Sequence, residues 1–110
     1  MTALLVLCTC PDAASAQAIA TALVQARLAA CVNILPGLRS VYRWEGRVEQ
    51  AEEVLLLAKT TPALFEQLKD RIVTLHPYRV PEILGFQSTT GLAQYLRWIE
   101  SETTDGSASP

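Results

Sequence analysis

The most constraining feature of the sequence is a pair of alternating apolar and polar runs that meet at a short turn. One run extends from Leu38 to Trp44 and the other from Val48 to Lys59. Alternation with a period of two is typical of strands, and the intervening Glu45-Gly46-Arg47 offers a glycine for a backbone with positive φ. The pattern predicts a long antiparallel hairpin with a polar tip and a buried base over residues 54–58.

The segments before the hairpin predict a strand, a helix and a second strand. Leu4 to Cys8 is apolar on both faces and too short for a helix, which favours a central, covered strand. Asp12 or Ser15 can cap an alanine-rich helix. The apolar positions expected on this helix are Ala16, Ile19, Ala20, Leu23 and Ala30. Cys31 to Ile34 resumes a strand, which Pro36-Gly37 bends or bulges.

The segments after the hairpin predict a helix, an extended loop, a strand and a last helix. Thr61 is expected to be an N-cap, with Pro62 at the first helical position. The helix should end before His76-Pro77, because a residue that precedes proline is disfavoured in the α region. A strand over 82–87 and a helix over 91–100 follow. The residues expected to be buried here are Leu64, Phe65, Leu68, Ile72, Leu75, Ile83, Phe86, Leu92, Tyr95, Leu96 and Ile99.

This order of elements, β-α-β-β-α-β with a third helix, matches the split βαβ arrangement of ferredoxin-like α+β folds. We expect one domain over residues 1–102 with an antiparallel sheet, followed by a flexible tail over 103–110 that is rich in Gly, Ser and Pro. Two helices cover only one face of such a sheet, whereas the first strand and residues 54–58 are apolar on both faces. The uncovered face predicts that the chain associates with copies of itself.

The composition narrows the classes of partner. Nine Lys and Arg residues against eleven Asp and Glu residues give a net charge of −2. A chain that binds nucleic acid or anionic membranes by charge would carry a positive excess, so neither partner is expected. No apolar run approaches the ~18 residues that span a bilayer. The odd number of cysteines, three, and the lack of an export signal predict reduced thiols in a cytoplasmic protein.

His76 is the only histidine, and three roles are open to it. It can donate a hydrogen bond to a carbonyl as a structural residue of the loop. It can bind copper or zinc through a neutral imidazole nitrogen. It can also act as a general base, although the sequence names no nucleophile or water site beside it.

The cysteines offer a weaker metal signal. Cys8 and Cys10 form a C-x-C whose side chains share one face if the first strand continues that far. Thiolates select copper(I) or zinc, but a lone C-x-C lacks the second pair of a typical zinc site, which favours small core residues instead. Cys31 opens a strand and is expected to serve packing.

The acidic residues and the motifs that the sequence lacks also bear on the function. Glu49, Glu52 and Glu53 are expected on a solvated hairpin surface, whereas Glu82 lies just beyond the His76 loop. The common nucleotide-binding and hydrolase fingerprints are missing from the sequence. An acylphosphatase-like enzyme would need an arginine after the first strand, and the segment 9–12 has none. No enzymatic activity is therefore expected.

Five segments together resemble one known family over residues 4–100. They are Cys31-Val32-Asn33-Ile34-Leu35-Pro36-Gly37, Ser40-Val41-Tyr42-Arg43-Trp44-Glu45-Gly46, Leu57-Ala58-Lys59-Thr60-Thr61, His76-Pro77-Tyr78-Arg79-Val80-Pro81-Glu82-Ile83 and Tyr95-Leu96-Arg97-Trp98. Their order and spacing are similar to those of the CutA divalent-cation tolerance family. The resemblance implies a ferredoxin-like homotrimer, similar in architecture to the PII signal proteins, with a non-enzymatic role in tolerance to divalent metals, copper above all.

The resemblance also implies roles for individual residues. Cys8 and His76 fall where members bind copper, whereas Leu75 stands where some members have a second histidine. Water, Glu82 or a neighbouring subunit would then complete the coordination. Glu82, Lys59 and Tyr78 correspond to the cleft between subunits. The alternative function is a PII-like signalling trimer that binds a small anionic ligand in this cleft.

Overall fold

The structure is a computed structural model of the chain and describes residues 2–104. The elements are β1 (Leu4–Cys10), α1 (Ala13–Gln25), β2 (Cys31–Trp44), β3 (Arg47–Thr60), a 3-10 turn (Pro62–Leu64), α2 (Phe65–Leu75), β4 (Ile83–Gln87) and α3 (Ala93–Glu102). This order confirms the predicted α+β arrangement of six elements and a third helix.

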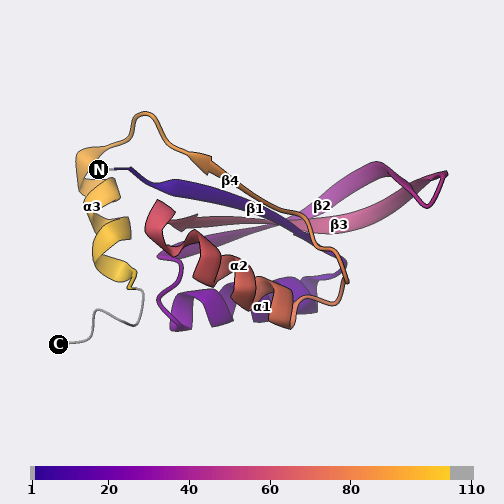
Figure 1. Cartoon of the computed structure of the whole chain (residues 1–110), viewed down its shortest axis with the longest axis horizontal. Helices are drawn as coiled ribbons and strands as arrows, with labels where there is room; N and C mark the ends of the chain where they lie inside the picture. Colours follow the sequence, from indigo (N-terminus) through magenta and orange to yellow (C-terminus); the bar gives the residue numbers. More distant parts are fainter. Residues whose placement is uncertain (1, 105–110) are drawn as a thin grey trace.

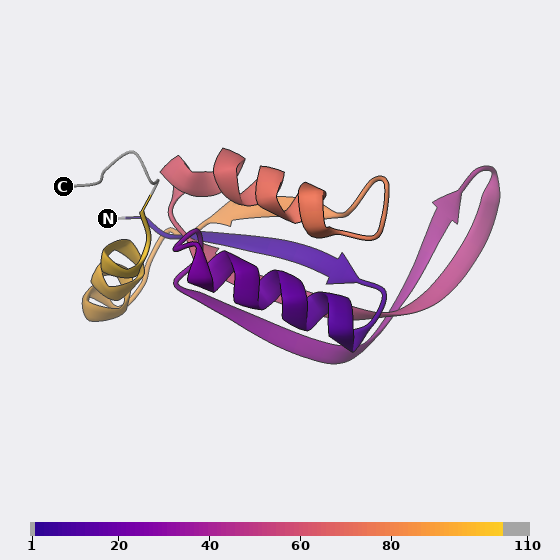
Figure 2. The same ribbon diagram turned by 90° about the horizontal axis from the view of Figure 1, so that it is seen from below.

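The four strands form one antiparallel sheet in the order β2-β3-β1-β4. Helices α1 and α2 lie side by side on one face of this sheet, as Figures 1 and 2 show. The core lies between the two layers, where apolar side chains of β1 and β3 meet those of both helices. Its most deeply buried members include Val6, Ile19, Leu23, Leu56, Leu68 and Ile72.

The hairpin of β2 and β3 extends well beyond the rest of the fold (Figure 1). The two strands stay paired until Trp44 faces Arg47, and Glu45 and Gly46 between them have φ angles of 48° and 80°. Two consecutive residues with positive φ match the right-handed twist of the flanking strands. The register shifts between Leu35 and Leu38, which confirms the predicted irregularity at Pro36-Gly37.

Helix α1 begins as predicted, because the carboxylate of Asp12 accepts a hydrogen bond of 2.7 Å from the backbone N–H of Ser15. Ala30 was expected on this helix but lies beyond its end, where its N–H donates to the carbonyl of Lys59. In the turn after the helix, Arg27 adopts a φ of 61°. Its guanidinium donates to the carbonyl of Ser101, which ties the end of α1 to the end of α3.

The start of this helical segment follows the prediction in part. Thr61 is the N-cap and Pro62 the first residue, but they open a 3-10 turn, and α2 itself begins at Phe65. The side chain of Thr61 makes no capping hydrogen bond. The predicted face is otherwise correct for Leu64, Leu68 and Ile72, which are buried. Leu75, the last residue of α2, was expected to be buried but is exposed.

Three further residues that were expected to be buried are exposed. Phe86 pairs with Leu5 and therefore points to the sheet face that α1 and α2 leave uncovered, where half of its surface is exposed. Helix α3 lies at the opposite end of the sheet from the hairpin tip (Figures 1 and 2). It buries Ile99, whereas Leu92 and Tyr95 are exposed. Hydrophobic periodicity predicted which face of α3 is apolar, but it did not predict how much of that face is buried.

The predicted tail starts at Thr103. The backbone N–H of Thr104 donates to the carbonyl of Arg27 at 2.9 Å, and residues 105–110 lie outside the described part of the chain. A flexible tail therefore stays a prediction. Over residues 2–104, no helix is both long enough and apolar enough to cross a membrane.

Candidate metal centre and adjoining groove

The end of β1 brings two cysteines to the same side of the sheet. Cys8 and Cys10 are alternate residues of β1, so both side chains point toward the helices, and both are fully buried. The loop from α2 to β4 passes this end of β1 (Figures 1 and 2) and places His76 beside them. One ligand atom from each of Cys8, Cys10 and His76 can be chosen so that all three lie within 4.8 Å of one another.

Both ring nitrogens of His76 are hydrogen-bonded. Nδ1 accepts from the backbone N–H of Tyr78 at 3.0 Å, and Nε2 lies 2.7 Å from the carbonyl oxygen of Thr9. An acceptor at Nδ1 and a carbonyl at Nε2 assign the proton to Nε2, so the imidazole is neutral. The hydrogen bond from Nε2 to the carbonyl of Thr9 corresponds to the structural role that the sequence left open for His76. Pro77 holds His76 in an extended conformation beyond α2, and this conformation allows the contact.

The two thiols influence each other's ionisation. A hydrogen bond with the Cys10 thiol raises the pKa of Cys8 far above its ordinary value, and burial adds to the rise. The same interaction lowers the pKa of Cys10, against the opposing effect of burial. The two opposite pKa shifts thus share one main cause, the interaction between the two thiols.

This donor set suits a soft metal ion. Two thiols and one imidazole match the preference of copper(I) and zinc for sulfur and nitrogen ligands. The sequence analysis considered both cysteines of the C-x-C as donors but favoured core residues, and Cys10 does lie in the core; only Cys8 and His76 were expected in a metal site. The sequence signal for Cys10 as a donor was the C-x-C spacing, because alternate residues of a strand point to the same face. It could not reveal that a histidine from a distant loop would lie beside the two thiols.

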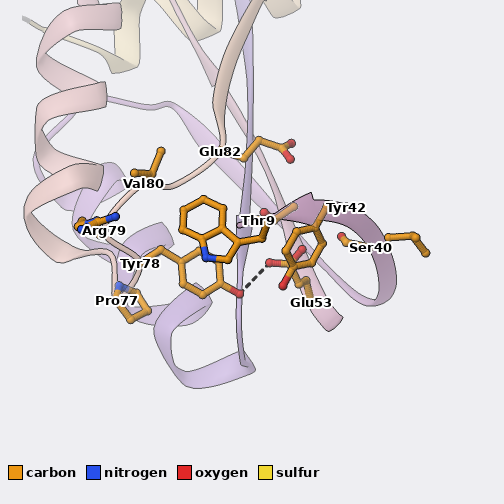
Figure 3. A pocket seen from close by; sticks show the side chains of 11 residues that line it. Thr9, Ser40, Tyr42, Glu53, Pro77, Tyr78, Arg79, Val80 and Glu82 are labelled. Atoms are coloured by element: carbon orange, nitrogen blue, oxygen red, sulfur yellow. Dashed lines mark hydrogen bonds between the residues drawn. The ribbon is translucent and has the colours of Figure 1, made fainter. Parts of the chain in front are cut away.

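A groove of about 680 Å³ adjoins this cluster on the hairpin side (Figure 3). Its lining residues come from the end of β1, the hairpin and the loop after α2. They are Thr9, Ser40, Val41, Tyr42, Trp44, Glu53, Pro77, Tyr78, Arg79, Val80 and Glu82. Thr9 connects the two sites, because its carbonyl accepts from His76 while the residue also lines the groove.

Glu53 is the buried acid of this groove. It was expected on a solvated surface, but only 8% of it is exposed. The hydroxyl of Tyr78 donates to its carboxylate at 2.8 Å (Figure 3). Burial, followed by the contact with Glu53, raises the pKa of Tyr78 to about 12. The burial prediction failed because the loop after α2 folds over this part of β3.

The groove contains two of the three residues expected in a cleft. Glu82 and Tyr78 line it, whereas Lys59 does not. Lys59 pairs with Leu5 near the start of β1, and its ammonium group donates to the side-chain oxygen of Asn33. Cys31 is partly buried and lies outside the three-donor cluster.

A comparison with known protein families shows to which family the chain is related. The family described as CutA1 divalent ion tolerance protein matches residues 4–102. The chain belongs to this family. The divalent-cation tolerance protein CutA of Thermus thermophilus is 52% identical over 98 residues, covering 89% of this chain and 95% of that protein. The protein of the same name from Pectobacterium atrosepticum is 43% identical over 99 residues, covering 90% of each.

Solved structures of the CutA1 family agree with the fold. The divalent cation tolerance protein from Thermus thermophilus superposes with a TM-score of 0.91 at 50% identity, covering 93% of this chain and 99% of that chain. CutA1 from Oryza sativa gives a TM-score of 0.92 at 35% identity, covering 96% of each chain. The ferredoxin-like prediction and the resemblance to the family are thus confirmed. The names of these relatives describe tolerance to divalent cations and refer to no reaction.

Proposed function

We propose that the protein binds copper through Cys8, Cys10 and His76 and contributes in this way, without catalysis, to metal tolerance. The observation that carries the proposal is the convergence of two thiols and one imidazole within 4.8 Å. Sulfur donors favour copper(I) over harder divalent ions. The proposal extends the predicted pair of ligands by Cys10, which makes three donors available within one chain.

The thiols are the principal ligands in this proposal. Both thiols would bind the metal as thiolates, so each would give up its proton on binding. His76 can bind only by giving up a hydrogen bond, either from Tyr78 N–H to Nδ1 or from Nε2 to the carbonyl of Thr9. Its contribution to affinity is therefore smaller than that of either thiolate.

Anaerobic titration with copper(I) against a chromophoric chelator tests the ligand assignment. We expect Cys8→Ser and Cys10→Ser each to lower the affinity more than His76→Gln. Cys31→Ser is the matched control, because it removes the third thiol of the chain outside the three-donor cluster. Equal affinities for wild type, Cys8→Ser and Cys10→Ser would contradict the proposal.

We also propose that the chain assembles as a homotrimer. The sheet face opposite α1 and α2 supports association, because Leu35, Leu84 and Phe86 on it are each more than half exposed. The resemblance to the CutA family supplies the number of chains. Sedimentation equilibrium should give three times the mass of the 12.0 kDa chain, and a monomer at micromolar concentration would contradict any self-association.

Fewer observations support the alternative function, a PII-like trimer that binds a small anion. Arg79 is the cationic side chain among the residues that line the groove, which also contain two carboxylates. Lys59, the other predicted cation of the cleft, lies outside the groove.

We also propose a cytoplasmic location. The copper site proposed above requires reduced thiols, which fit that compartment.

A further inference from the structure

The groove combines aromatic rings with an excess of negative charge. Tyr42 and Trp44 come from β2, and Tyr78 comes from the loop after α2. Glu53 and Glu82 contribute two carboxylates, and Arg79 contributes one guanidinium. The lining therefore carries a formal net charge of −1, from two carboxylates and one guanidinium.

The placement of these charges favours a cation inside the groove. Glu53 is 8% exposed, and Tyr78 donates to one of its carboxylate oxygens, Oε2, at 2.8 Å. Arg79 lies on the far side of Tyr78 from Glu53 (Figure 3). A buried carboxylate is stabilised by a nearby positive charge, and Arg79 does not supply it.

The aromatic rings narrow the chemistry of this cation. Faces of Trp and Tyr attract cations whose charge is spread over an apolar surface, as in alkylammonium groups. The lining also supplies oxygen ligands, two carboxylates and the four hydroxyls of Thr9, Ser40, Tyr42 and Tyr78, but oxygen ligands alone suit a small inorganic ion, and it is the rings that favour an organic one. The volume of about 680 Å³ also exceeds what a bare ion occupies.

We propose that the groove between the hairpin and the loop after α2 binds an organic cation, an alkylammonium or guanidinium group, against Trp44 and Glu53. Two sources present this chemistry: a free small amine and a lysine or arginine side chain of a second copy of the chain. The groove adjoins the three-donor cluster through Thr9 and Tyr78, but Cys8, Cys10 and His76 are not among its lining residues, so the proposal does not rest on copper binding.

Binding of choline and of its uncharged isostere 3,3-dimethyl-1-butanol tests the proposal with the full chain. The indole N–H resonance of Trp44 reports on the groove in NMR spectra, and Trp98→Phe assigns it, since the chain has two tryptophans. We expect choline to shift this resonance to saturation. The alcohol should bind at least about ten-fold more weakly, because it lacks the cationic attraction to the rings.

Two variants and one control locate the effect. Glu53→Gln retains an acceptor for the Tyr78 hydroxyl but removes the charge, and Trp44→Leu removes a ring that is 46% exposed. Each should weaken choline binding about ten-fold. Glu52→Gln changes the net charge equally at the next residue, whose side chain is 84% exposed and lies near Arg39. It should leave choline binding unchanged.

The same variants distinguish the two sources. If a basic side chain of a second copy fills the groove, choline will not shift Trp44 in the assembled protein. Glu53→Gln and Trp44→Leu will then weaken assembly in sedimentation equilibrium, while Glu52→Gln will not. The proposal is overturned if choline and the alcohol bind equally, if Glu53→Gln does not weaken choline binding, or if choline fails to bind and both variants assemble like wild type.

Discussion

Tyr78→Phe should lower the free energy of unfolding by about 2 kcal/mol. The hydroxyl donates at 2.8 Å to Glu53, a carboxylate that is 8% exposed. Hydrogen bonds to charged groups contribute about 1.5–3 kcal/mol, and loss of the donor leaves a desolvated acceptor. The distance is longer than the shortest bonds of this type, which places the expected effect in the lower half of that range.

Urea unfolding of wild type and variant at one protein concentration measures this change, because self-association makes the midpoint depend on concentration. Tyr42→Phe is the matched control. Tyr42 also lines the groove but is 43% exposed, so loss of its hydroxyl should change stability by less than about 0.5 kcal/mol.

A double-mutant cycle with Glu53→Ala isolates the pair, because alanine leaves no acceptor for the Tyr78 hydroxyl. The coupling between the two substitutions should be about 1–2 kcal/mol, since the residues contact each other directly. A Tyr78→Phe variant within 0.5 kcal/mol of wild type (about the error of such comparisons) would refute the reasoning. A coupling of zero would show that the hydroxyl acts through another group.

Three other outcomes follow from the structure. Cys8→Ser should weaken copper(I) by more than about 100-fold and copper(II) by less, and both affinities should fall on acidification as ligands regain protons; equal losses for the two ions would contradict the thiolate assignment. The pKa of Tyr78, raised from 10.0 to about 12, means that its stabilising effect is present below pH 10 and lost as the pH rises to 12; ultraviolet titration should show a last tyrosinate step that Tyr78→Phe removes. Glu45→Asn should raise the urea midpoint by the equivalent of about 0.5–1 kcal/mol, because Asn tolerates the φ of 48° better than Glu; an unchanged midpoint would show that this turn is unstrained.

Local patterns predicted much of the fold but little of the candidate site. The hairpin, the cap at Asp12 and the end of α2 before His76-Pro77 depend on neighbouring residues, and the structure confirms all three. Glu53 was misjudged, because burial depends on what covers a side chain. Its cover comes from the loop that follows α2, which is distant in sequence and places the Tyr78 hydroxyl against it. Cys10 is buried in the core, as the sequence favoured.

The sequence by itself determined the order of elements, the alternation of the hairpin strands and the motifs that mark the CutA1 family. These properties follow from hydrophobic periodicity and backbone preferences, which act over a few residues. Only the tertiary structure decided that Cys10 lies within reach of both Cys8 and His76, and that Lys59 lies outside the groove. Hydrophobic periodicity acts over a few neighbouring residues, whereas these positions depend on how the loop after α2 packs against strands that are distant in sequence.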